Sequence, residues 1–503
     1  MAAGDSGGAT GLRPDPRFLL EDSLMRQAFV SRAVQQQPGQ TPFAFHTLRF
    51  ALFGLLAIGS LISEAQAQAP PAPPVSSSLT ELQELLGAAL FFDTTLSQPV
   101  GQACGSCHLP STGFTFPDPI VNEILGPVPG AVQGRFGLRK PPTVAYASFM
   151  PQGPPAFNTA LNKYVGGFFW DGRAATLTAQ AALPFQNPNE MNNVVHGVGS
   201  PAQVVSKVQQ GASAWLFEIV YGRNAFSQPT ATVFAQIVAA IVAFENTEAV
   251  SPFDSKYDAY LAGEVMLSST EMLGLQLFTG STTGRPGGPA NYKNAGCSGC
   301  HSIPSNASSG PDLFTNAGYS NTGVPRNPNN PYYTETNAQS NPQGYNPLGA
   351  AFVDYGLGAF LYPNQSLPSG NVGPGSNGQG DFLKVNGKFK TPTLRNVDKR
   401  PYAGFIKCFN HNGVFKSLAD VVHFYNARNL TSVEGEVIDF TAANPYATLQ
   451  GEPEFPPPEY PFNLANAAGT LAGVGNLGLT EDEEAAVVAF MQTLSDGYGF
   501  FGP

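Results

Sequence analysis

Charged side chains are scarce in this chain. They make up 12% of the 503 residues, roughly half of the ~25% that is usual in globular proteins. The 25 Lys and Arg residues form no cluster, and 36 Asp and Glu residues outnumber them, which gives a formal net charge of −11. A protein that tracks nucleic-acid phosphates needs a concentrated basic surface, so the charge pattern argues against a nucleic-acid partner.

Residues 50–63 form an apolar run that is too short for a membrane span, because a helix needs ~20 apolar residues to cross a bilayer. The run follows Arg49 and precedes Ala65-Gln66-Ala67, and this order of basic, apolar and small residues is typical of a cleaved export signal. We therefore interpret residues 1–74 as a leader that ends in a stiff Pro-rich linker. An uncleaved anchor and a start at Met25 stay open as alternatives.

Cysteine is rare, with five residues, and four of them fall in two Cys-x-x-Cys-His motifs. The motifs are Cys104-Gly-Ser-Cys107-His108 and Cys297-Ser-Gly-Cys300-His301. In such a motif two thiols form thioethers with the vinyl groups of haem, and the adjoining imidazole binds the iron. Export brings the chain to the compartment where c-type haem is attached. The sequence therefore predicts two covalently bound haem c groups.

The cysteine pairs have two other interpretations. Four thiolates could hold one zinc ion, although each pair carries its own His and lies in its own part of the chain. Disulfides within Cys-x-x-Cys are strained and usually redox-active, and the flanking sequence lacks the βαβ pattern of such redox sites. Cys408 is left over, and we expect it to be a buried thiol.

Glycine and proline are abundant, with 55 and 45 residues, which predicts many loops. Hydrophobic residues at 42% and aromatic residues at 11% are too plentiful for a disordered chain, so the loops must connect packed elements. One long surface loop is expected at about residues 305–380, where Asn, Gly, Pro, Ser and Tyr crowd together without an apolar period.

Five sequence blocks occur twice in the same order, which indicates two copies of one domain. The paired blocks are residues 84–91 and 271–278, the two Cys-x-x-Cys-His motifs, residues 142–144 and 392–394, residues 171–177 and 412–418, and residues 239–244 and 485–490. We expect domains at residues 75–250 and 251–503, with the long loop inserted in the second. The repeats look helical, most clearly at residues 480–494, where Thr480 and Glu483 stand at capping-box spacing.

The repeat also predicts what faces each iron on the side away from its histidine. An open position admits a small ligand, whereas a filled one favours electron transfer. Tyr425 follows Gly413 at the same distance at which Pro184 follows Gly172. Proline has no donor atom, so the first haem should be open and the second should take the Tyr425 phenolate. His423 is the alternative ligand, and Tyr425 would then be a core aromatic.

The segment around Pro184 supplies candidate catalytic residues. A carboxylate in a partly apolar pocket can carry a proton between the two oxygens of hydrogen peroxide, and Glu190 is our candidate. Gln180 lies on the same segment. Trp170, one of two tryptophans, begins it, and its ring is expected to relay electrons between the haems. Core packing for Trp170 and a surface position for Glu190 are the alternatives.

These motifs resemble the bacterial di-haem cytochrome c peroxidase and MauG family over most of residues 79–494. The resemblance rests on the two haem motifs, residues 169–174, residues 180–191, residues 389–396 and residues 411–413. It implies an all-α fold of two tandem cytochrome c-like haem domains with long loops, located in the periplasm, with a calcium ion between the domains. In the family, the position of Trp170 lies between the haems, and the positions of Gln180 and Glu190 line the peroxide pocket.

The function implied is a di-haem c-type peroxidase that reduces hydrogen peroxide to water with electrons passed through the second haem. A small cytochrome or cupredoxin would donate the electrons. Tyr425 stands where many family peroxidases have Met, and no His lies between Pro142 and Trp170 to serve as a loop ligand, although Met150 is available there. Both features resemble MauG, which oxidises a protein substrate. A MauG-like enzyme and a non-enzymatic electron-transfer cytochrome remain alternatives, and a homodimer stays open.

The chain departs from the family beside the expected calcium site. In the family, Pro-Tyr is followed almost at once by His-Asp-Gly or His-Asn-Gly, whereas here an extra segment separates Pro401-Tyr402 from His411. The family's calcium ion uses backbone carbonyls beside this Pro and an Asn side chain, for which Asn158 and Asn162 are candidates. Lys399 is unexpected near such a site.

Overall fold

The structure is a computed structural model that describes residues 78–304, 310–334, 346, 348–362, 385–439, 444–460 and 473–499. Apart from Ser78, these residues belong to one compact unit, Leu79–Pro503. The expected leader at residues 1–74, with its apolar run at residues 50–63, lies outside the described residues, as do parts of the loop expected at residues 305–380. None of the described helices is long and apolar enough to cross a membrane.

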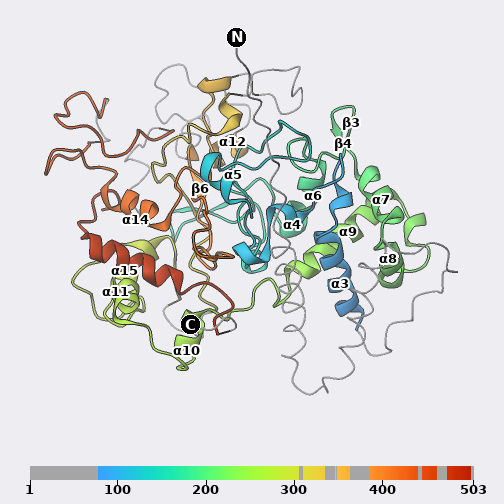
Figure 1. Ribbon diagram of the computed structural model, residues 1–503, viewed down its shortest axis with the longest axis horizontal. Coiled ribbons are helices and arrows are strands. Elements are labelled where there is room, and N and C mark those ends of the chain that lie inside the picture. The colour runs from blue at the N-terminus through green and yellow to red at the C-terminus, as the bar shows by residue number, and fades with distance from the viewer. Residues whose placement is uncertain are drawn as a thin grey trace, which may run out of the picture. The chain divides into compact units, whose positions relative to one another are not determined.

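The described residues are rich in helix (Figure 1). The α-helices are α3 (Leu79–Phe91), α4 (Cys104–Cys107), α5 (Pro119–Ile124), α6 (Leu177–Gln186), α7 (Pro201–Gln210), α8 (Ala214–Tyr221), α9 (Thr230–Glu245), α10 (Lys256–Leu261), α11 (Ser269–Thr279), α12 (Leu357–Leu361), α14 (Leu418–Ala427) and α15 (Glu481–Gln492). Short 3-10 helices lie between them: η1 (Thr94–Leu96), η2 (Pro110–Thr112), η3 (Ala147–Phe149), η4 (Ala225–Ser227), η5 (Cys297–Gly299), η7 (Pro331–Tyr333) and η8 (Gly349–Ala351).

Three antiparallel sheets of two strands each complete the regular structure of the described residues. They pair β1 (Ala156–Asn158) with β2 (Lys163–Val165), β3 (Val194–Val195) with β4 (Val198–Gly199), and β5 (Tyr319–Ser320) with β6 (Phe389–Lys390). The all-α expectation is therefore right about the dominance of helix but omits these ladders. Strands of two or three residues leave no periodic pattern in a sequence.

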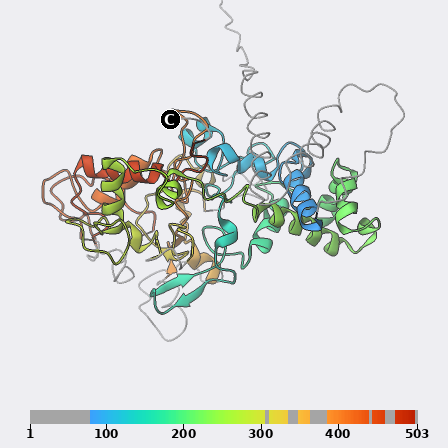
Figure 2. The ribbon, with the colours of Figure 1, turned by 90° about the horizontal axis from the view of Figure 1, so that it is seen from below.

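Two pairs of helices cross in the same way, one toward each end of the unit (Figure 1, Figure 2). α3 packs on α9, and α11 packs on α15. A Cβ atom on Gly87 would lie 1.8 Å from the carbonyl oxygen of Ala240, and one on Gly274 would lie 1.9 Å from that of Ala486. Only glycine lets the two backbones approach this closely. The first and last repeated blocks of the sequence therefore fold into the same contact twice.

A third helix in each half is also built alike. Thr176 caps α6 and Ser417 caps α14, each by accepting a hydrogen bond from the backbone amide three residues later. α6 packs against α9, and α14 packs against α15. Pro184 and Tyr425 stand at the same distance from these caps, so they occupy equivalent positions in their helices.

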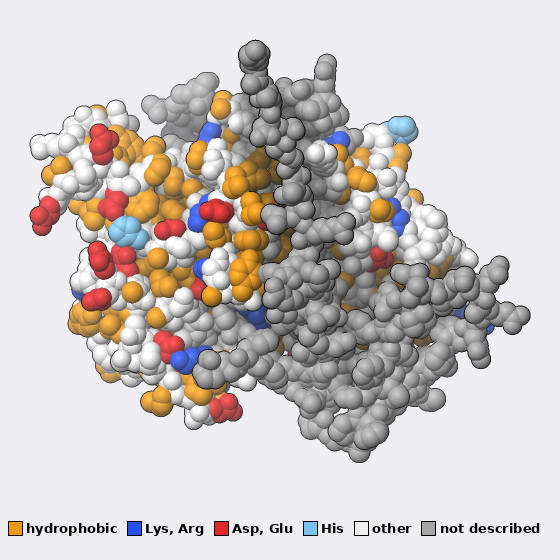
Figure 3. Space-filling model, in the orientation of Figure 1, with side chains coloured by type: hydrophobic (Ala, Val, Ile, Leu, Met, Phe, Trp, Pro, Cys, Tyr) orange, Lys and Arg blue, Asp and Glu red, His pale blue; other side chains and the backbone are white. Residues whose placement is uncertain are grey.

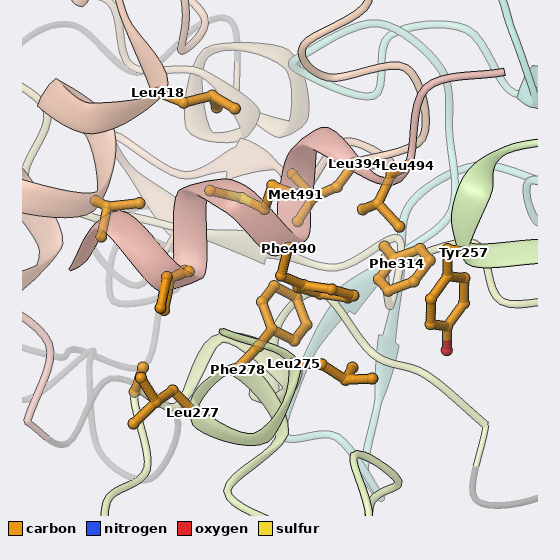
Figure 4. Close-up of a cluster of buried hydrophobic side chains, with 14 of the residues drawn as sticks. Tyr257, Leu275, Leu277, Phe278, Phe314, Leu394, Leu418, Phe490, Met491 and Leu494 are labelled. Carbon is orange, nitrogen blue, oxygen red and sulfur yellow. The ribbon is translucent and has the colours of Figure 1, made fainter. Parts of the chain in front are cut away.

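The end of the unit that holds α11 and α15 encloses a large apolar cluster (Figure 4). The rings of Phe278 and Phe490 meet with centroids 5.3 Å apart, and Phe314 lies against both. The predicted capping box of α15 is present, since Thr480 accepts from the amide of Glu483 and the Glu483 carboxylate accepts from the amide of Thr480. α15 thus begins where the sequence predicts, and its apolar face closes the cluster.

Two described parts of the expected inserted loop are packed against the rest of the unit. Residues 310–334 contain the buried side chain of Tyr319, and residues 348–362 contain that of Asp354 and the helix α12. The hydroxyl of Tyr319 donates to the carbonyl of Gly166 at 2.7 Å. Buried polar and aromatic side chains give no apolar period, which is why the sequence indicated only a surface loop.

Acidic side chains cluster on part of the face shown in Figure 3. Asp and Glu side chains gather at the left of this view, toward α14 and α15. The first turn of α15 alone carries Glu481, Asp482, Glu483 and Glu484. Negative side chains interact favourably with the positive end of a helix dipole, so the acidic turn supports the start of α15.

Candidate haem sites

The histidines of the two haem motifs are held alike. Nδ1 of His108 lies 3.0 Å from the carbonyl oxygen of Phe114, and Nδ1 of His301 lies 2.9 Å from that of Phe314. Both phenylalanines have a positive φ, 56° and 53°, which turns the chain back toward the imidazole. An Nδ1–H that donates to a carbonyl leaves Nε2 available for iron. Burial lowers the pKa of both histidines to about 4, so the imidazoles are neutral, as a metal ligand must be.

These two supporting turns are functional features that the sequence analysis missed. A Phe-Thr pair follows each haem motif, Phe114-Thr115 and Phe314-Thr315, and this repeat is the signal that could have found them. The hydroxyls of Thr115 and Thr315 donate to the backbone carbonyls of Thr112 and Thr391. Each ligand histidine therefore rests on a turn that is braced by its own hydrogen bonds.

A cavity of about 220 Å³ lies beside the second motif. Cys297, Cys300 and His301 line it, and so does Tyr425 of α14. Apolar side chains supply much of the remaining lining: Phe278, Leu418, Val421, Val422, Leu477, Leu479, Val487 and Met491. Haem is a large and mostly apolar group, so this lining and these donors fit a covalently attached haem.

The two candidate ligands on α14 point in different directions. The ring nitrogens of His423 lie 2.9 Å from a carboxylate oxygen of Glu484 and 2.7 Å from one of Glu454, and the side chain is 45% exposed. The side chain of Tyr425 lines the cavity instead. The helix therefore brings Tyr425 to the second cysteine pair and turns His423 toward solvent and two carboxylates.

The surroundings of Tyr425 act on its phenol in opposite directions. The pKa of Tyr425 is raised, chiefly by burial, although a hydrogen bond with Thr322 and the positive charge of Arg428 oppose the rise. Arg428 follows on the same stretch of chain, and its guanidinium favours the phenolate over the phenol. The phenolate is the form of tyrosine that ligates ferric iron.

Acidic side chains flank the first cysteine pair. Burial, together with the negative charge of Glu190, raises the pKa of Cys107 to about 12. Burial also raises the pKa of Cys104, and the charge of Glu245 adds to this rise. Glu190 and Glu245 therefore both lie within electrostatic reach of the thiols that would carry the first haem.

Glu190 is partly buried and its backbone is fixed. Its amide donates to the carbonyl of Asn187 at 3.1 Å, and its own carbonyl accepts from the amide of Ala131 at 2.8 Å. Burial raises the pKa of the Glu190 carboxyl group, while Arg173 and a hydrogen bond with Asn187 oppose the rise. A positioned carboxyl group whose pKa lies closer to neutrality can both accept and donate a proton there.

Pro184 removes one backbone hydrogen bond from α6, the helix that precedes Glu190. Pro184 has no backbone N–H, so the carbonyl of Gln180 has no helical donor. The side chain of Gln180 is partly buried. The amide of Met191 donates to the carbonyl of Pro184 at 3.2 Å, which folds the Glu190 segment back onto the end of α6. α6 thus presents no donor atom at the position where α14 presents the phenol of Tyr425.

Glu245 is a buried acid that the sequence analysis missed. It ends α9, is 3% exposed, and its Oε2 has no hydrogen-bond partner among the described residues. Burial raises its pKa to about 8. The sequence holds a signal for this residue. The repeat aligns Phe244 with Phe490, so Glu245 takes the place of the apolar Met491 in the other copy.

Trp170 is a buried side chain at the cavity beside the second motif. It lines the cavity of the second motif together with Thr115, which belongs to the turn that supports His108. Its indole Nε1–H donates to the carbonyl of Lys140 at 2.8 Å, and its ring meets that of His411 edge to face with centroids 6.5 Å apart. The side chain is 7% exposed. The indole is therefore buried and held in one orientation by the carbonyl of Lys140.

An ion-pair cluster ties the inserted segment to the residues next to Trp170. The Arg139 guanidinium donates to Asp171 at 2.6 Å and to both carboxylate oxygens of Asp354 at 2.7 Å. Burial alone would raise the pKa of both carboxyl groups, but Arg139 outweighs it and lowers them. Because Asp354 comes from residues 348–362, part of the expected surface loop helps to hold this region together.

The cysteine geometry does not suit the other interpretations of the motifs. Among the described residues, no group of three or more His, Cys, Asp or Glu side chains is placed to hold a metal ion, so the two pairs do not form one zinc site. The five cysteines are free thiols. Cys408 is buried, as expected, with its Sγ 3.3 Å from Oδ1 of Asn122.

The expected calcium ligands are not gathered into a site. Oδ1 of Asn158 accepts from the backbone amide of Leu161 in the β1–β2 hairpin, where Asn162 is exposed. The carbonyl of Lys399, beside the expected calcium position, accepts a hydrogen bond from Nζ of Lys407 at 3.0 Å. The residues present therefore do not fit a calcium ion at this place.

Comparisons with known proteins agree with this geometry. The model of the di-haem cytochrome c peroxidase family matches residues 81–266. The chain is 31% identical to the methylamine utilization protein MauG of Paracoccus denitrificans, over 89% of this chain and 96% of that protein. It is also 31% identical to the cytochrome c551 peroxidase of Nitrosomonas europaea, over 51% of this chain and 64% of that protein. The crystal structure of the diheme peroxidase BthA from Burkholderia thailandensis superposes with a TM-score of 0.57 at 26% identity, covering 86% of this chain and 90% of that one.

The similarity to MauG runs through nearly the whole of both chains, so it covers both haem motifs. Each motif has a histidine held by a backbone carbonyl, and the residues fit two c-type haems. This chain belongs to the di-haem cytochrome c peroxidase and MauG family of oxidoreductases.

Proposed function

We propose that this protein reduces hydrogen peroxide to water at the site of Cys104, Cys107 and His108, with electrons that arrive through the site of His301 and Tyr425. The proposal rests on one difference between α6 and α14. Pro184 occupies the position in α6 that Tyr425 occupies in α14. Cys104, Cys107 and His108 would hold a haem whose iron could accept peroxide, because α6 offers no further ligand there. Cys297, Cys300, His301 and Tyr425 would hold a haem that transfers electrons.

The residues around the first site then have separate tasks. Glu190 takes the proton from one peroxide oxygen and returns it to the other, because its fixed backbone and raised pKa suit a carboxyl group that both accepts and donates. Gln180 orients the peroxide from the preceding helix. Trp170 carries oxidising equivalents between the sites, since its indole is buried and fixed by the carbonyl of Lys140.

A MauG-like role is the second candidate, and Tyr425 favours it. A tyrosinate ligand stabilises ferric and more oxidised iron, which suits the oxidation of a protein substrate at a distance. The near full-length similarity to MauG supports this candidate too. The two roles share the same residues and differ in the partner, which is either a small cytochrome or cupredoxin that donates electrons or a specific protein that is oxidised.

The spectrum of the purified ferric holoprotein tests the shared part of the proposal. We expect one high-spin signal from the open site and one low-spin signal from the closed site. Tyr425→Phe should change only the low-spin signal, and His423→Gln, two residues away on the same helix, should change neither. Two low-spin signals that persist on reduction would instead support a non-enzymatic electron-transfer cytochrome.

The partner decides between the two roles. When peroxide is added to the holoprotein, a peroxidase should oxidise two molecules of a reduced small cytochrome or cupredoxin for each peroxide, because one peroxide and two protons take up two electrons to form two waters, and each donor gives one electron. A MauG-like enzyme should instead oxidise one exported protein at defined residues, which mass spectrometry of the peroxide-treated mixture would locate.

We further propose that residues 75–250 and 251–503 are two tandem cytochrome c-like domains that the leader directs to the periplasm. The matching helix crossings at Gly87 and Gly274 support the duplication. The order of residues around the run at 50–63 supports export. N-terminal sequencing of the mature protein from a periplasmic extract tests the export, and its mass in solution tests whether it forms a homodimer.

A further inference from the structure

Lys407 is a buried lysine whose ammonium group is fully engaged with the backbone. Its side chain is 3% exposed. Nζ donates to the carbonyl oxygens of Thr112 at 2.9 Å, Asn396 at 3.1 Å and Lys399 at 3.0 Å. An ammonium group has three N–H donors, so these three acceptors use all of them. Hydrogen bonds from a charged donor are also stronger than neutral ones.

The three carbonyls come from both halves of the unit. Thr112 lies in η2, in the turn that supports His108. Asn396 and Lys399 lie in the second half, after the strand β6. The two segments pack closely, because a Cβ atom on Gly113 would lie 2.6 Å from Cβ of Asn396. Lys407 therefore places a positive charge at a tight junction between the first haem site and the C-terminal half.

We propose that the ammonium group of Lys407 is a built-in cation that joins the two halves, in place of the calcium ion that the family resemblance leads one to expect. Lys407 lies on the extra segment between Tyr402 and His411, so the departure from the family sequence supplies the residue. The carbonyl of Lys399, beside the expected calcium position, is one of its three acceptors.

The other groups near Lys407 also disfavour a divalent cation. Calcium takes six to eight oxygen ligands, usually with carboxylates among them. The carboxylate of Asp398 is bound by the guanidinium of Arg400 at 2.6 Å. The side-chain oxygen of Asn396 accepts from the amide of Asp496 at 2.8 Å. These oxygens are therefore already in use.

The charges around Lys407 determine the pH at which the proposal is best tested. Burial, with the positive charges of Lys140 and Arg400, lowers the pKa of Lys407 to about 7, while Asp398 and Cys408 act in the other direction. The ammonium form therefore dominates at about pH 6, and a second cation placed beside Lys140 and Arg400 would be repelled there.

The experiment measures calcium content and thermal stability of the full-length holoprotein at pH 6. We expect calcium well below one ion per chain after dialysis against EGTA, and the same Tm in EGTA and in calcium chloride. Lys407→Met, which keeps the stem and removes the charge, should lower Tm. The matched control is Lys416→Met, because Lys416 also joins the halves, through the carbonyls of Asn122 and Gly413 at 2.7 Å, but is less buried.

A drop in Tm that is several degrees larger for Lys407→Met than for Lys416→Met would support the proposal. One tightly held calcium ion per wild-type chain, a lower Tm of the wild type in EGTA, or equal drops for the two variants would overturn it. If Lys407→Met does not accumulate as holoprotein, the calcium content and EGTA response of the wild type still decide. None of these readouts uses peroxide turnover, so the result is independent of the proposed reaction.

Discussion

The two helix trios, α3, α6 and α9 in one half and α11, α14 and α15 in the other, share a scaffold but differ in chemistry. In each trio a glycine lets two backbones cross, and a hydroxyl side chain caps the third helix. The differences are single residues on that scaffold, Pro184 against Tyr425 and Glu245 against Met491. Contacts between backbones thus build the same scaffold twice, whereas single side chains on that scaffold give the two sites different chemistry.

Replacing the crossing glycines should give the largest effect, and the same one in both halves. In Gly87→Ala and Gly274→Ala the new Cβ atom would meet a backbone carbonyl at 1.8 and 1.9 Å, and the backbone cannot move aside as a flexible side chain would. We expect a loss of roughly 3 to 5 kcal/mol in the free energy of unfolding, measured by denaturant titration, or no holoprotein at all.

The control for the crossing glycines is Gly137→Ala, whose Cβ atom would come no closer than 3.5 Å to other atoms. It should leave stability nearly unchanged. A wild-type stability in either Gly87→Ala or Gly274→Ala would mean that the two halves do not depend on the shared crossing.

Glu190→Gln should remove activity from the open site while both spectra stay intact. Loss of a general acid and base costs on the order of 10²- to 10⁴-fold in turnover. Burial raises the pKa of Glu190, so wild-type peroxide turnover should rise with pH as the carboxylate forms, and this rise should vanish in the variant. Stopped-flow kinetics with peroxide measure both effects. Glu248→Gln, an exposed glutamate in the same half, is the control, and equal loss in the two variants would refute a catalytic role for Glu190.

Glu245→Gln should make the stability of the first half less sensitive to pH. The folded pKa of Glu245 is raised from 4.5 to about 8 by burial, so the stability it contributes is full below pH 4.5 and is lost as pH rises toward 8. The loss is about 1.4 kcal/mol per pH unit, or roughly 2 to 3 kcal/mol between pH 5 and pH 7. Denaturant titrations at these two pH values should show a smaller fall for the variant than for the wild type. A parallel fall in both would show that Glu245 keeps its ordinary pKa.

The sequence predicted the parts of this molecule that depend on local pattern. The haem motifs are explicit, and α15 begins at the capping box of Thr480 and Glu483 because both residues act within one turn. The equivalence of Pro184 and Tyr425 also followed from counting along the repeat. These features need no knowledge of distant contacts.

The parts that the sequence did not predict depend on contacts between distant segments. Phe114 and Phe314 adopt a positive φ, which phenylalanine rarely does, so nothing in the residue type indicates the turn. Glu245 and Lys407 are charged residue types that are seldom buried, and only the packed structure shows their surroundings. Residues 310–334 pack against the rest of the unit, but the sequence predicts a surface loop there because their buried side chains are partly polar.

The smallest effect is expected from His423→Gln, and it separates a surface ion pair from an iron ligand. Glu484 and Glu454 outweigh the desolvation of the partly exposed imidazole and raise the pKa of His423 above 6.5. A raised folded pKa contributes stability that is present below pH 6.5 and is lost as pH rises through the folded value. Because the side chain is 45% exposed, solvent screens the pair and its contribution should stay below about 1 kcal/mol.

The variant should therefore melt slightly below the wild type at pH 5.5 and together with it at pH 9, with an unchanged low-spin signal. Loss of that signal would make His423 the ligand of the second haem and would remove the contrast between Pro184 and Tyr425 on which the open and closed sites rest.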